Sequence, residues 1–369
     1  MTGSTGATGA SPGSTPRSAP GASGASPGPS AALGRSLRVL VGLAISALFI
    51  AITVSRVNLA EVGSALGRVN FAVVLLALPV VALELVLRAA RWQRLLRPIA
   101  AIPLRRCVAY LAVGYFANSM LPARLGDLAR AYLAGRAFGV GRLAALGTIV
   151  VERLADGLFI LALVTTLGLL LTGGATLAST ALSLAVLAVI GLSVLLLGIA
   201  WLRRPTIGTG GGSSGLGRLR ARVRLLVERV LDGARALQTI VGFAEVSLLT
   251  IVAFGCAVVT FTIVGTAAGA NLSIPQYALA MGAVALSTSI PAAPGSIGTY
   301  EFVGLTILVA LGLSPELALA VVVLVHLVTT LPLALAGLVA TWQLHFRVGE
   351  IVADAQPGGP PDVESAGAR

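Results

Sequence analysis

The sequence contains no lysine and few charged residues of any kind. Its 26 basic residues are all arginine, 14 residues are acidic, and charged residues make up 11% of the 369 positions, whereas 56% are hydrophobic. A soluble domain carries about 25% charged residues, so this composition excludes an ordinary water-soluble fold. Several apolar runs reach about 18 residues, the length needed to cross a bilayer as a helix. We therefore predict an all-α integral membrane protein.

Cysteine and histidine are also scarce, with two of each in the whole chain. Cys107 and Cys256 lie far apart in apolar runs, which excludes a zinc-binding spacing and a disulfide framework. The segment "GTGGGSSG" is not followed by Lys and Ser or Thr, so it is not a phosphate-binding loop. We therefore expect no catalytic residue, no metal and no cofactor, although these absences alone leave an enzyme open.

The net charge of +12 fits two kinds of partner, nucleic acid or membrane lipid. Most arginines flank apolar runs, which is the pattern of membrane topology and of contact with anionic headgroups, so nucleic acid is not expected. Arg35 and Arg38 precede the first run and place the N-terminus in the cytoplasm. The short run 108–122 has basic segments on both sides. Both its ends therefore favour the cytoplasm, which fits a re-entrant hairpin better than a single span.

Composition divides the chain into five regions. The longest polar interval begins with a Gly/Ser-rich linker and continues with apolar residues at helical spacing. Its stretch 216–237 is predicted to be a basic amphipathic helix that binds anionic lipids of the inner leaflet; a solvated cytosolic helix is the alternative. The five regions are a disordered cytoplasmic tail at 1–34, a first membrane half at 35–202 with a re-entrant segment near 108–138, the cytoplasmic interval 203–242, a second membrane half at 243–345 with a re-entrant segment near 277–312, and a polar C-terminal tail at 346–369.

Two polar interruptions of the apolar runs resemble each other. "SMLPARLG" contains Pro122 and Gly126, and "TSIPAAPGSIGTYE" contains Pro291 and Gly295, so each has a glycine four residues after a proline. Each interruption precedes a long apolar run, and arginine placement gives the two halves opposite orientations. We therefore predict about six full spans plus two re-entrant helical breaks arranged as an inverted repeat. Paired breaks of this kind point to a transport site.

Charged residues inside apolar runs are costly in lipid and are therefore candidates for function. When Gly141 is matched to Gly312, Arg153 and His326 fall two positions apart in the alignment of the two halves, and both lie in long runs. The alternative is a network of internal ion pairs that only fixes helix packing. The candidates of this kind are Glu84, Arg88, Glu152, Arg153, Asp156, Glu301 and His326.

The breaks themselves suggest an anion site. A helix that restarts at Pro122 leaves N–H groups free, and such groups attract anions. Arg124 and Arg130 add positive charge in a planar geometry that suits phosphate, while Asn118 can hold the turn and Asp127 can orient the arginines. The alternative is a kinked helix whose arginines only mark topology. The candidates in the breaks are Asn118, Pro122, Arg124, Gly126, Asp127 and Arg130 in the first and Pro291, Gly295 and Gly298 in the second.

Four motifs, in this order, resemble the signature regions of the lysylphosphatidylglycerol synthase transmembrane-region family, a flippase-like membrane domain. They are "RAARWQRLL", "NSMLPARLGDLAR", "VVERLADGL" and "PAAPGSIGTYE". The resemblance covers about residues 35–345 and implies a bacterial inner-membrane protein with a lipid-accessible cavity between re-entrant helices. The chain resembles a stand-alone member, because no soluble aminoacyltransferase domain follows the last run. The cavity residues implied by the resemblance are Arg88, Arg91, Asn118, Pro122, Arg124, Gly126, Glu152, Arg153, Asp156, Pro294, Gly295 and Glu301.

These observations together predict a flippase-like lipid translocase. Its guest is expected to be an anionic or aminoacylated phospholipid, or a polyprenyl-phosphate-linked lipid, held between the two re-entrant segments. The alternative is a membrane-embedded transferase, or an accessory subunit, that acts on a lipid carrier together with a separate lipid-modifying enzyme. A third hypothesis is a scaffold whose buried charges fix packing. The oligomeric state is left open.

Overall fold

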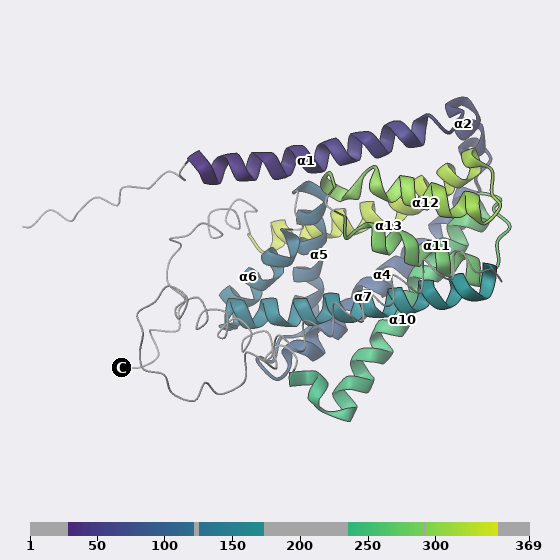
Figure 1. Ribbon diagram of the computed structural model, residues 1–369. Helices are drawn as coiled ribbons and strands as arrows, with labels where there is room; N and C mark the ends of the chain where they lie inside the picture. Colours follow the sequence, from purple (N-terminus) through teal and green to yellow (C-terminus); the bar gives the residue numbers. More distant parts are fainter. Residues whose placement is uncertain (1–28, 122–124, 173–234, 291, 346–369) are drawn as a thin grey trace, which may run out of the picture.

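A computed structural model describes residues 29–121, 125–172, 235–290 and 292–345 (Figure 1). Every regular element in these ranges is a helix, which confirms the all-α prediction. The expected span at 176–202, most of the 216–237 helix and the C-terminal tail lie outside the described residues. The first helix, α1 (Pro29–Val54), begins inside the stretch that composition assigns to an N-terminal tail.

Four of the described helical segments are long and apolar enough to cross a membrane. A further segment, Leu40–Val54, meets Leu59–Gly67 at an 82° bend and adds a fifth crossing if the bent pair is taken as one span. A multi-pass membrane protein is therefore supported, whereas the count of about six spans stays a prediction. The four segments are Phe71–Leu96, Leu143–Leu171, Ile240–Ala267 and Pro315–Gln343.

The outer surface carries large apolar side chains that water would not tolerate in such numbers. Leu83, Leu170 and Leu248, on three different long helices, are all more than half exposed. A soluble protein rarely leaves so much contiguous apolar surface uncovered, and lipid is the solvent that suits it. Some charged groups, by contrast, are buried inside the helix assembly, among them Arg91, Arg130 and Glu152.

The first group of helices contains a pair too short to cross a bilayer. At 17 and 13 residues, α5 and α6 are about 26 and 20 Å long, less than the hydrocarbon core of about 30 Å. α5 packs against α4 and α6, and α6 packs against α7. The first break thus lies between two short helices that contact each other. The group comprises α4 (Ala77–Leu96), α5 (Leu104–Met120), α6 (Gly126–Phe138) and α7 (Arg142–Thr172).

The second group has the same order of long, short, short and long helices. α11 packs against α10 and α12, and α12 packs against α13. The second break lies between α11 and α12 and includes a single 3-10 turn, η3 (Pro294–Ser296). The helices are α10 (Ile240–Ala267), α11 (Ile274–Ser287), α12 (Thr299–Ala310) and α13 (Pro315–Gln343).

The two groups interlock through reciprocal contacts. α4 packs against α10, α5 packs against α13, and α7 packs against α11. α5 and α13 approach closely because Gly337 presents no side chain to the backbone of Ala112. Outside this assembly, α1 runs alongside α12 (Figure 1). The helix packing thus brings both breaks into contact with the long helices that follow them.

Candidate functional site

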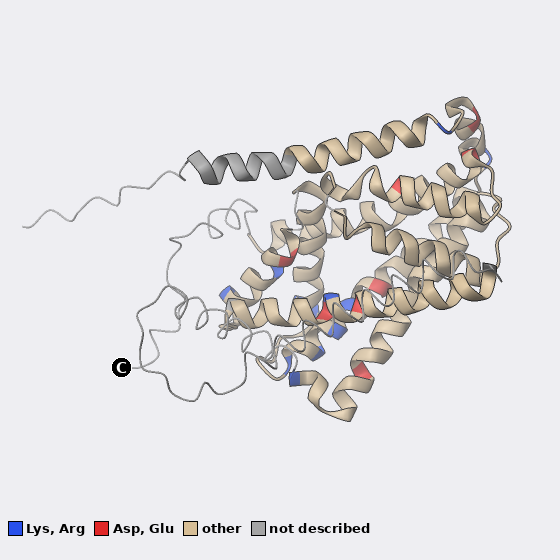
Figure 2. Cartoon of the chain, viewed as in Figure 1, with Lys and Arg blue, Asp and Glu red and all other residues tan. Residues whose placement is uncertain are grey.

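A group of buried arginines and carboxylates lies between α4, α6 and α7 (Figure 2). Arg91 of α4 donates from Nη2 to Glu152 Oε1 at 3.0 Å and also binds Asp156 through both guanidinium nitrogens. Arg130 of α6 donates from Nη1 to the other oxygen of Glu152 at 3.0 Å. The side chains of Arg91 and Arg130 are 1% exposed. Each of these arginines is thus occupied by carboxylates rather than free for a ligand.

Neighbouring side chains complete the surroundings of the two buried guanidinium groups. Thr250 of α10 accepts a hydrogen bond from Arg91 at 3.1 Å, so the second helix group also contributes to the site. The guanidinium of Arg130 lies 5.2 Å from the ring centroid of Trp92, whose indole N–H donates to Thr148. A buried charge that loses its partner costs about 3–5 kcal/mol, so these contacts bind α4, α6 and α7 together.

Two further ion pairs lie at the more accessible edge of the same group. Arg88 binds Glu84 at 2.7 Å, and Arg153 binds Asp127 at 3.2 Å. The Arg153 side chain is 36% exposed and that of Asp127 is 21% exposed, far more than the buried pairs. We call the eight residues the arginine–carboxylate network: Glu84, Arg88, Arg91, Asp127, Arg130, Glu152, Arg153 and Asp156.

The network is balanced in charge, with four arginines and four carboxylates among the described residues. Such balance is what a low-dielectric interior demands, because an unpaired charge there is far more costly than a paired one. A ligand can therefore reach the network only at its accessible edge, where Arg153 and Asp127 lie. Pro122 and Arg124, which sequence reasoning assigns to the same edge, lie outside the described residues.

Asn118 holds the two short helices of the first break together. Its Oδ1 accepts a hydrogen bond of 2.8 Å from the backbone N–H of Gly126, the first residue of α6. The backbones of the two helices are in direct contact at Gly114 and Gly126. A Cβ at Gly126 would overlap the carbonyl oxygen of Gly114. Asn118 and Gly126, both predicted as site residues, therefore shape the break itself.

The second break is pinned by side chains from three helices. Glu301 of α12 accepts a 2.6 Å hydrogen bond from the N–H of Gly298, and its other oxygen contacts His326 of α13. His326 also lies 3.0 Å from the carbonyl oxygen of Gly295. Ser46 of α1 accepts a 2.8 Å hydrogen bond from the N–H of Ala293. Pro294 begins η3 within this break, whereas Pro291 lies outside the described residues.

The arginine–carboxylate network and the residues of the second break lie next to each other in the fold. α5 of the first group packs against η3 in the second break. Thr250 of α10, in the second group, also binds Arg91 of the arginine–carboxylate network. Residues from both halves of the sequence are therefore assembled around one part of the molecule.

Sequence reasoning missed two residues that take part. Thr250 and Ser46 contact the site, but each appears in the sequence as an ordinary residue of an apolar helix. Only helix packing, which brings α10 and α1 to the site, distinguishes them from similar residues elsewhere. Glu84 was recognised in the sequence, and its pairing with Arg88 at four residues' distance follows from helix geometry.

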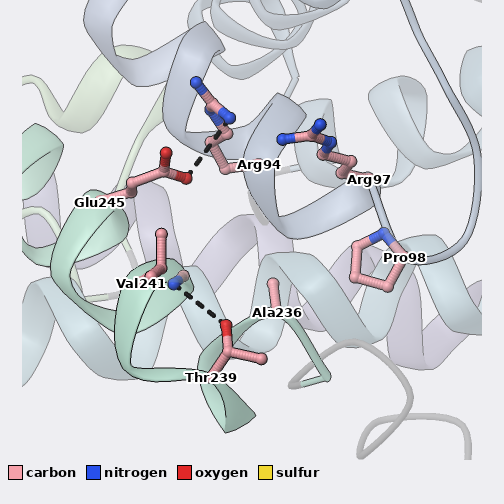
Figure 3. Close-up of a pocket in the computed structure, with 8 residues that line it drawn as sticks. Arg94, Arg97, Pro98, Ala236, Thr239, Val241 and Glu245 are labelled. Atoms are coloured by element: carbon pink, nitrogen blue, oxygen red, sulfur yellow. Dashed lines mark hydrogen bonds and ion pairs between the residues drawn. The ribbon is translucent and has the colours of Figure 1, made fainter.

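A separate cavity of about 280 Å³ lies at the junction of α4 and α10 (Figure 3). Arg94 and Glu245 form an ion pair of 3.4 Å across it, and both side chains are more than one-third exposed. Thr239 caps α10 by accepting a hydrogen bond from the N–H of Gly242. None of the eight residues that line the cavity belongs to the arginine–carboxylate network, and the sequence patterns do not predict it.

Comparison with known proteins agrees with the motifs. Residues 39–337 match the model of a protein family described as "Lysylphosphatidylglycerol synthase TM region". The chain is also 27% identical over 335 residues to a protein of Haloferax volcanii named glycosyltransferase AglD. That alignment covers 80% of this chain and 52% of the relative, so the chain spans about half the relative's length.

Proposed function

The chain belongs to the lysylphosphatidylglycerol synthase transmembrane-region family, and we propose that it moves a lipid between the leaflets of a bacterial cytoplasmic membrane. The N-terminus would lie in the cytoplasm, as Arg35 and Arg38 indicate at the start of α1, ahead of its apolar run. The guest would be an anionic or aminoacylated phospholipid or a polyprenyl-phosphate-linked lipid. The observation that carries the proposal is the partly exposed pair Asp127–Arg153 at the break between two short helices.

An inverted repeat would allow the lipid site to open to one side of the membrane and then to the other. The order of helix lengths is the same in α4–α7 and α10–α13, and the contacts between the groups are reciprocal. In inverted-repeat transporters, broken helices of the two halves surround the substrate, and rocking of one half against the other alternates access. The two breaks of this chain would play that part, with residues 108–138 and 277–312 as the re-entrant segments.

An anionic headgroup suits the accessible edge of the network. Arg153 keeps its charge at all physiological pH values and offers a planar set of donors that matches phosphate. Its contact with Asp127 orients the guanidinium, and an arriving phosphate would compete with that carboxylate. Asp127 would in turn attract the amine of an aminoacylated headgroup. Arg124, although outside the described residues, lies next to this edge in the sequence and would add a second cation.

A second candidate function rests on the named relative. Glycosyltransferase AglD is named as a transferase, and this chain aligns with about half of it. A membrane-embedded transferase, or an accessory subunit acting on a lipid carrier beside a separate enzyme, is therefore the alternative. Incubation of the purified protein with polyprenyl phosphate and nucleotide sugars separates the two, because a transferase consumes the lipid whereas a translocase leaves it chemically unchanged.

Leaflet distribution in cells tests the proposal. Cells that produce wild-type protein, Arg153→Ala or Arg68→Ala at equal levels are treated with an impermeant reagent that labels outer-leaflet lipids. Arg68, at the end of α2, matches the substitution at an exposed position outside the network. We expect Arg153→Ala to shift the transbilayer distribution and Arg68→Ala to leave it as in wild type. The same distribution in all three would contradict a translocase.

A further inference from the structure

His326 lies between two oxygen atoms in the second break. Its Nδ1 contacts Oε1 of Glu301, and its Nε2 lies 3.0 Å from the carbonyl oxygen of Gly295. A neutral imidazole has one N–H donor, and a backbone carbonyl can only accept. Both contacts are hydrogen bonds only when one more proton is present, on Nδ1 or on the carboxyl group of Glu301. The arrangement therefore binds one proton beyond those of a neutral histidine and an ionised glutamate.

We propose that Glu301 and His326 form a proton-binding site that pins the second break to α13 when occupied and releases it when empty, so that lipid movement is coupled to a proton gradient. The proton is shared between Nδ1 and Oε1, and it leaves to water when the site opens. The coupling part rests on the proposed lipid translocation. The proton site itself rests on the geometry of the break alone.

Loss of the proton would remove the attraction that holds the break. The lone pair of Nδ1 would then face an ionised carboxylate oxygen, and the contact would become repulsive. The backbone around it is conformationally demanding, because Gly295 has φ 72° and Ser296 has φ 60°. A left-handed conformation at a residue such as Ser296 costs about 1–2 kcal/mol and persists only where surrounding contacts hold it. The break is therefore suited to change conformation when the contact fails.

The charged and titratable groups on helices packed against α13 have partners of their own. Tyr300 of α12 stacks on the imidazole. Glu84 of α4 interacts with Tyr300 but is paired with Arg88 at 2.7 Å. Tyr115 of α5 interacts with Arg88 and Arg153 of the network. On the remaining neighbours, Glu61 of α2 accepts from Asn58, and Glu245 of α10 pairs with Arg94.

The corresponding pair in the first half has no such dependence on pH. Asp127 and Arg153 are 26 residues apart, Glu301 and His326 are 25 apart, and each acid lies in the first turn of a short helix. Arginine stays protonated in proteins, whereas histidine changes charge near neutral pH. A proton would therefore act on one break and leave the other unaffected. Such asymmetry is what coupling requires, because a signal that changed both breaks equally would favour neither side.

The site is only partly shielded. The side chains of His326 and Glu301 are 11% and 17% exposed. Coupling requires that this opening face water in at least one state, and the partial burial makes the pair sensitive to whether the proton is present. His345, by contrast, is exposed near the end of α13 and serves as an internal control.

Imidazole ¹⁵N NMR of the full chain in lipid nanodiscs tests the proton site without a lipid substrate. The chain has two histidines, so His345→Gln leaves His326 as the one residue that gives imidazole signals. We expect chemical shifts of a doubly protonated or proton-sharing imidazole that are lost at high pH, and their loss at neutral pH in Glu301→Gln. Glu301→Asp, which keeps the carboxylate, serves if Glu301→Gln does not fold. A singly protonated imidazole that does not respond to Glu301→Gln would overturn the proposal.

Coupling is tested in vesicles of phosphatidylethanolamine and phosphatidylglycerol with a fluorescent phosphatidylglycerol probe and an imposed pH gradient. Movement of one anionic lipid together with one proton carries no net charge and gives about tenfold accumulation of the probe per pH unit, because 1.4 kcal/mol corresponds to a factor of ten. We expect this accumulation with wild type and His345→Gln and its loss with His326→Gln. Probe movement that does not depend on the pH gradient would contradict the coupling but not the proposed translocation. No probe movement, with the NMR signature intact, overturns translocation and coupling and leaves the proton site.

Discussion

Asp127 and Arg153 lie 3.2 Å apart between α6 and α7, and Glu301 and His326 make the corresponding contact between α12 and α13. In both pairs the acid lies in the first turn of a short helix and the base lies in the long helix that follows. Each pair thus links a break in the chain to a helix that is long enough to cross the membrane. The proposed function depends on these two links.

The buried ion pairs of the arginine–carboxylate network should contribute to the free energy of unfolding, whereas the more exposed ion pair beside them should contribute little. Arg91→Ala leaves Glu152 and Asp156 without their shared partner and should cost about 3–5 kcal/mol of unfolding free energy. Arg94→Ala, one turn later on the same helix, removes an exposed pair and should cost less than about 1 kcal/mol. Thermal unfolding in detergent compares the two variants. Equal loss in both would contradict a structural role for the buried network.

The contact between α5 and α6 should depend on the absence of a side chain at Gly126. A methyl group there would overlap the carbonyl oxygen of Gly114, and Gly126→Ala should destabilise the protein by about 1–3 kcal/mol. Gly255→Ala is the matched control, because a Cβ at that exposed position of α10 meets no atom within 4 Å. The control should be neutral or slightly stabilising, since alanine favours helix more than glycine does. Unfolding temperatures that fall alike would mean that the packing of the break is looser than described.

The second break should tolerate a side chain at one glycine better than at the other. Gly298 has φ 93°, and a Cβ there would lie 2.7 Å from the carbonyl oxygen of Ser46, so Gly298→Ala adds a clash to backbone strain. Gly295 has φ 72°, and a Cβ there would make only an ordinary contact of 3.8 Å with the Ile297 side chain, so Gly295→Ala should cost only about 1–2 kcal/mol of strain. The yield of monodisperse protein and its unfolding temperature measure both. A larger loss of unfolding temperature in Gly295→Ala than in Gly298→Ala would show that α1 does not pack closely against this break.

A lipid that co-purifies with the protein should depend on Arg153. Mass spectrometry of extracted lipid is expected to find an enriched anionic lipid with wild type and with Arg68→Gln. Arg153→Gln should lose that enrichment, because the guanidinium at the accessible edge of the network is gone. Retention of the same lipid by Arg153→Gln would place its headgroup elsewhere.

The sequence predicted the all-α fold class and singled out most of the charged residues that helix packing brings together. Apolar runs show where long helices lie, and charged residues within them stand out because lipid penalises them. The match of Arg153 with His326 was also visible, because the two halves have similar spacing. The inverted repeat and the six spans remain predictions, since residues 173–234 lie outside the described part of the chain.

The roles of the residues were harder to predict than their positions. Arg130 suggests anion binding in the sequence, and the family resemblance implies Arg91 as a cavity residue, yet each is enclosed by carboxylates from other helices. Those partners come from positions up to 65 residues away, so no local pattern reveals the pairing. Thr250 was missed for the same reason, because its contact with Arg91 spans 159 residues. Side chains on neighbouring helices, rather than local spacing, decide whether an arginine binds a ligand or holds the fold together.

Transbilayer movement of a fluorescent phosphatidylglycerol in vesicles that contain the purified protein tests the central claim most directly. An impermeant quencher added outside reports how fast inner-leaflet probe reaches the outer leaflet. We predict faster movement with wild type than in protein-free vesicles, and a rate about tenfold lower with Arg153→Ala, equivalent to about 1.4 kcal/mol in the barrier. A wild-type rate equal to that of protein-free vesicles would contradict lipid translocation by this chain.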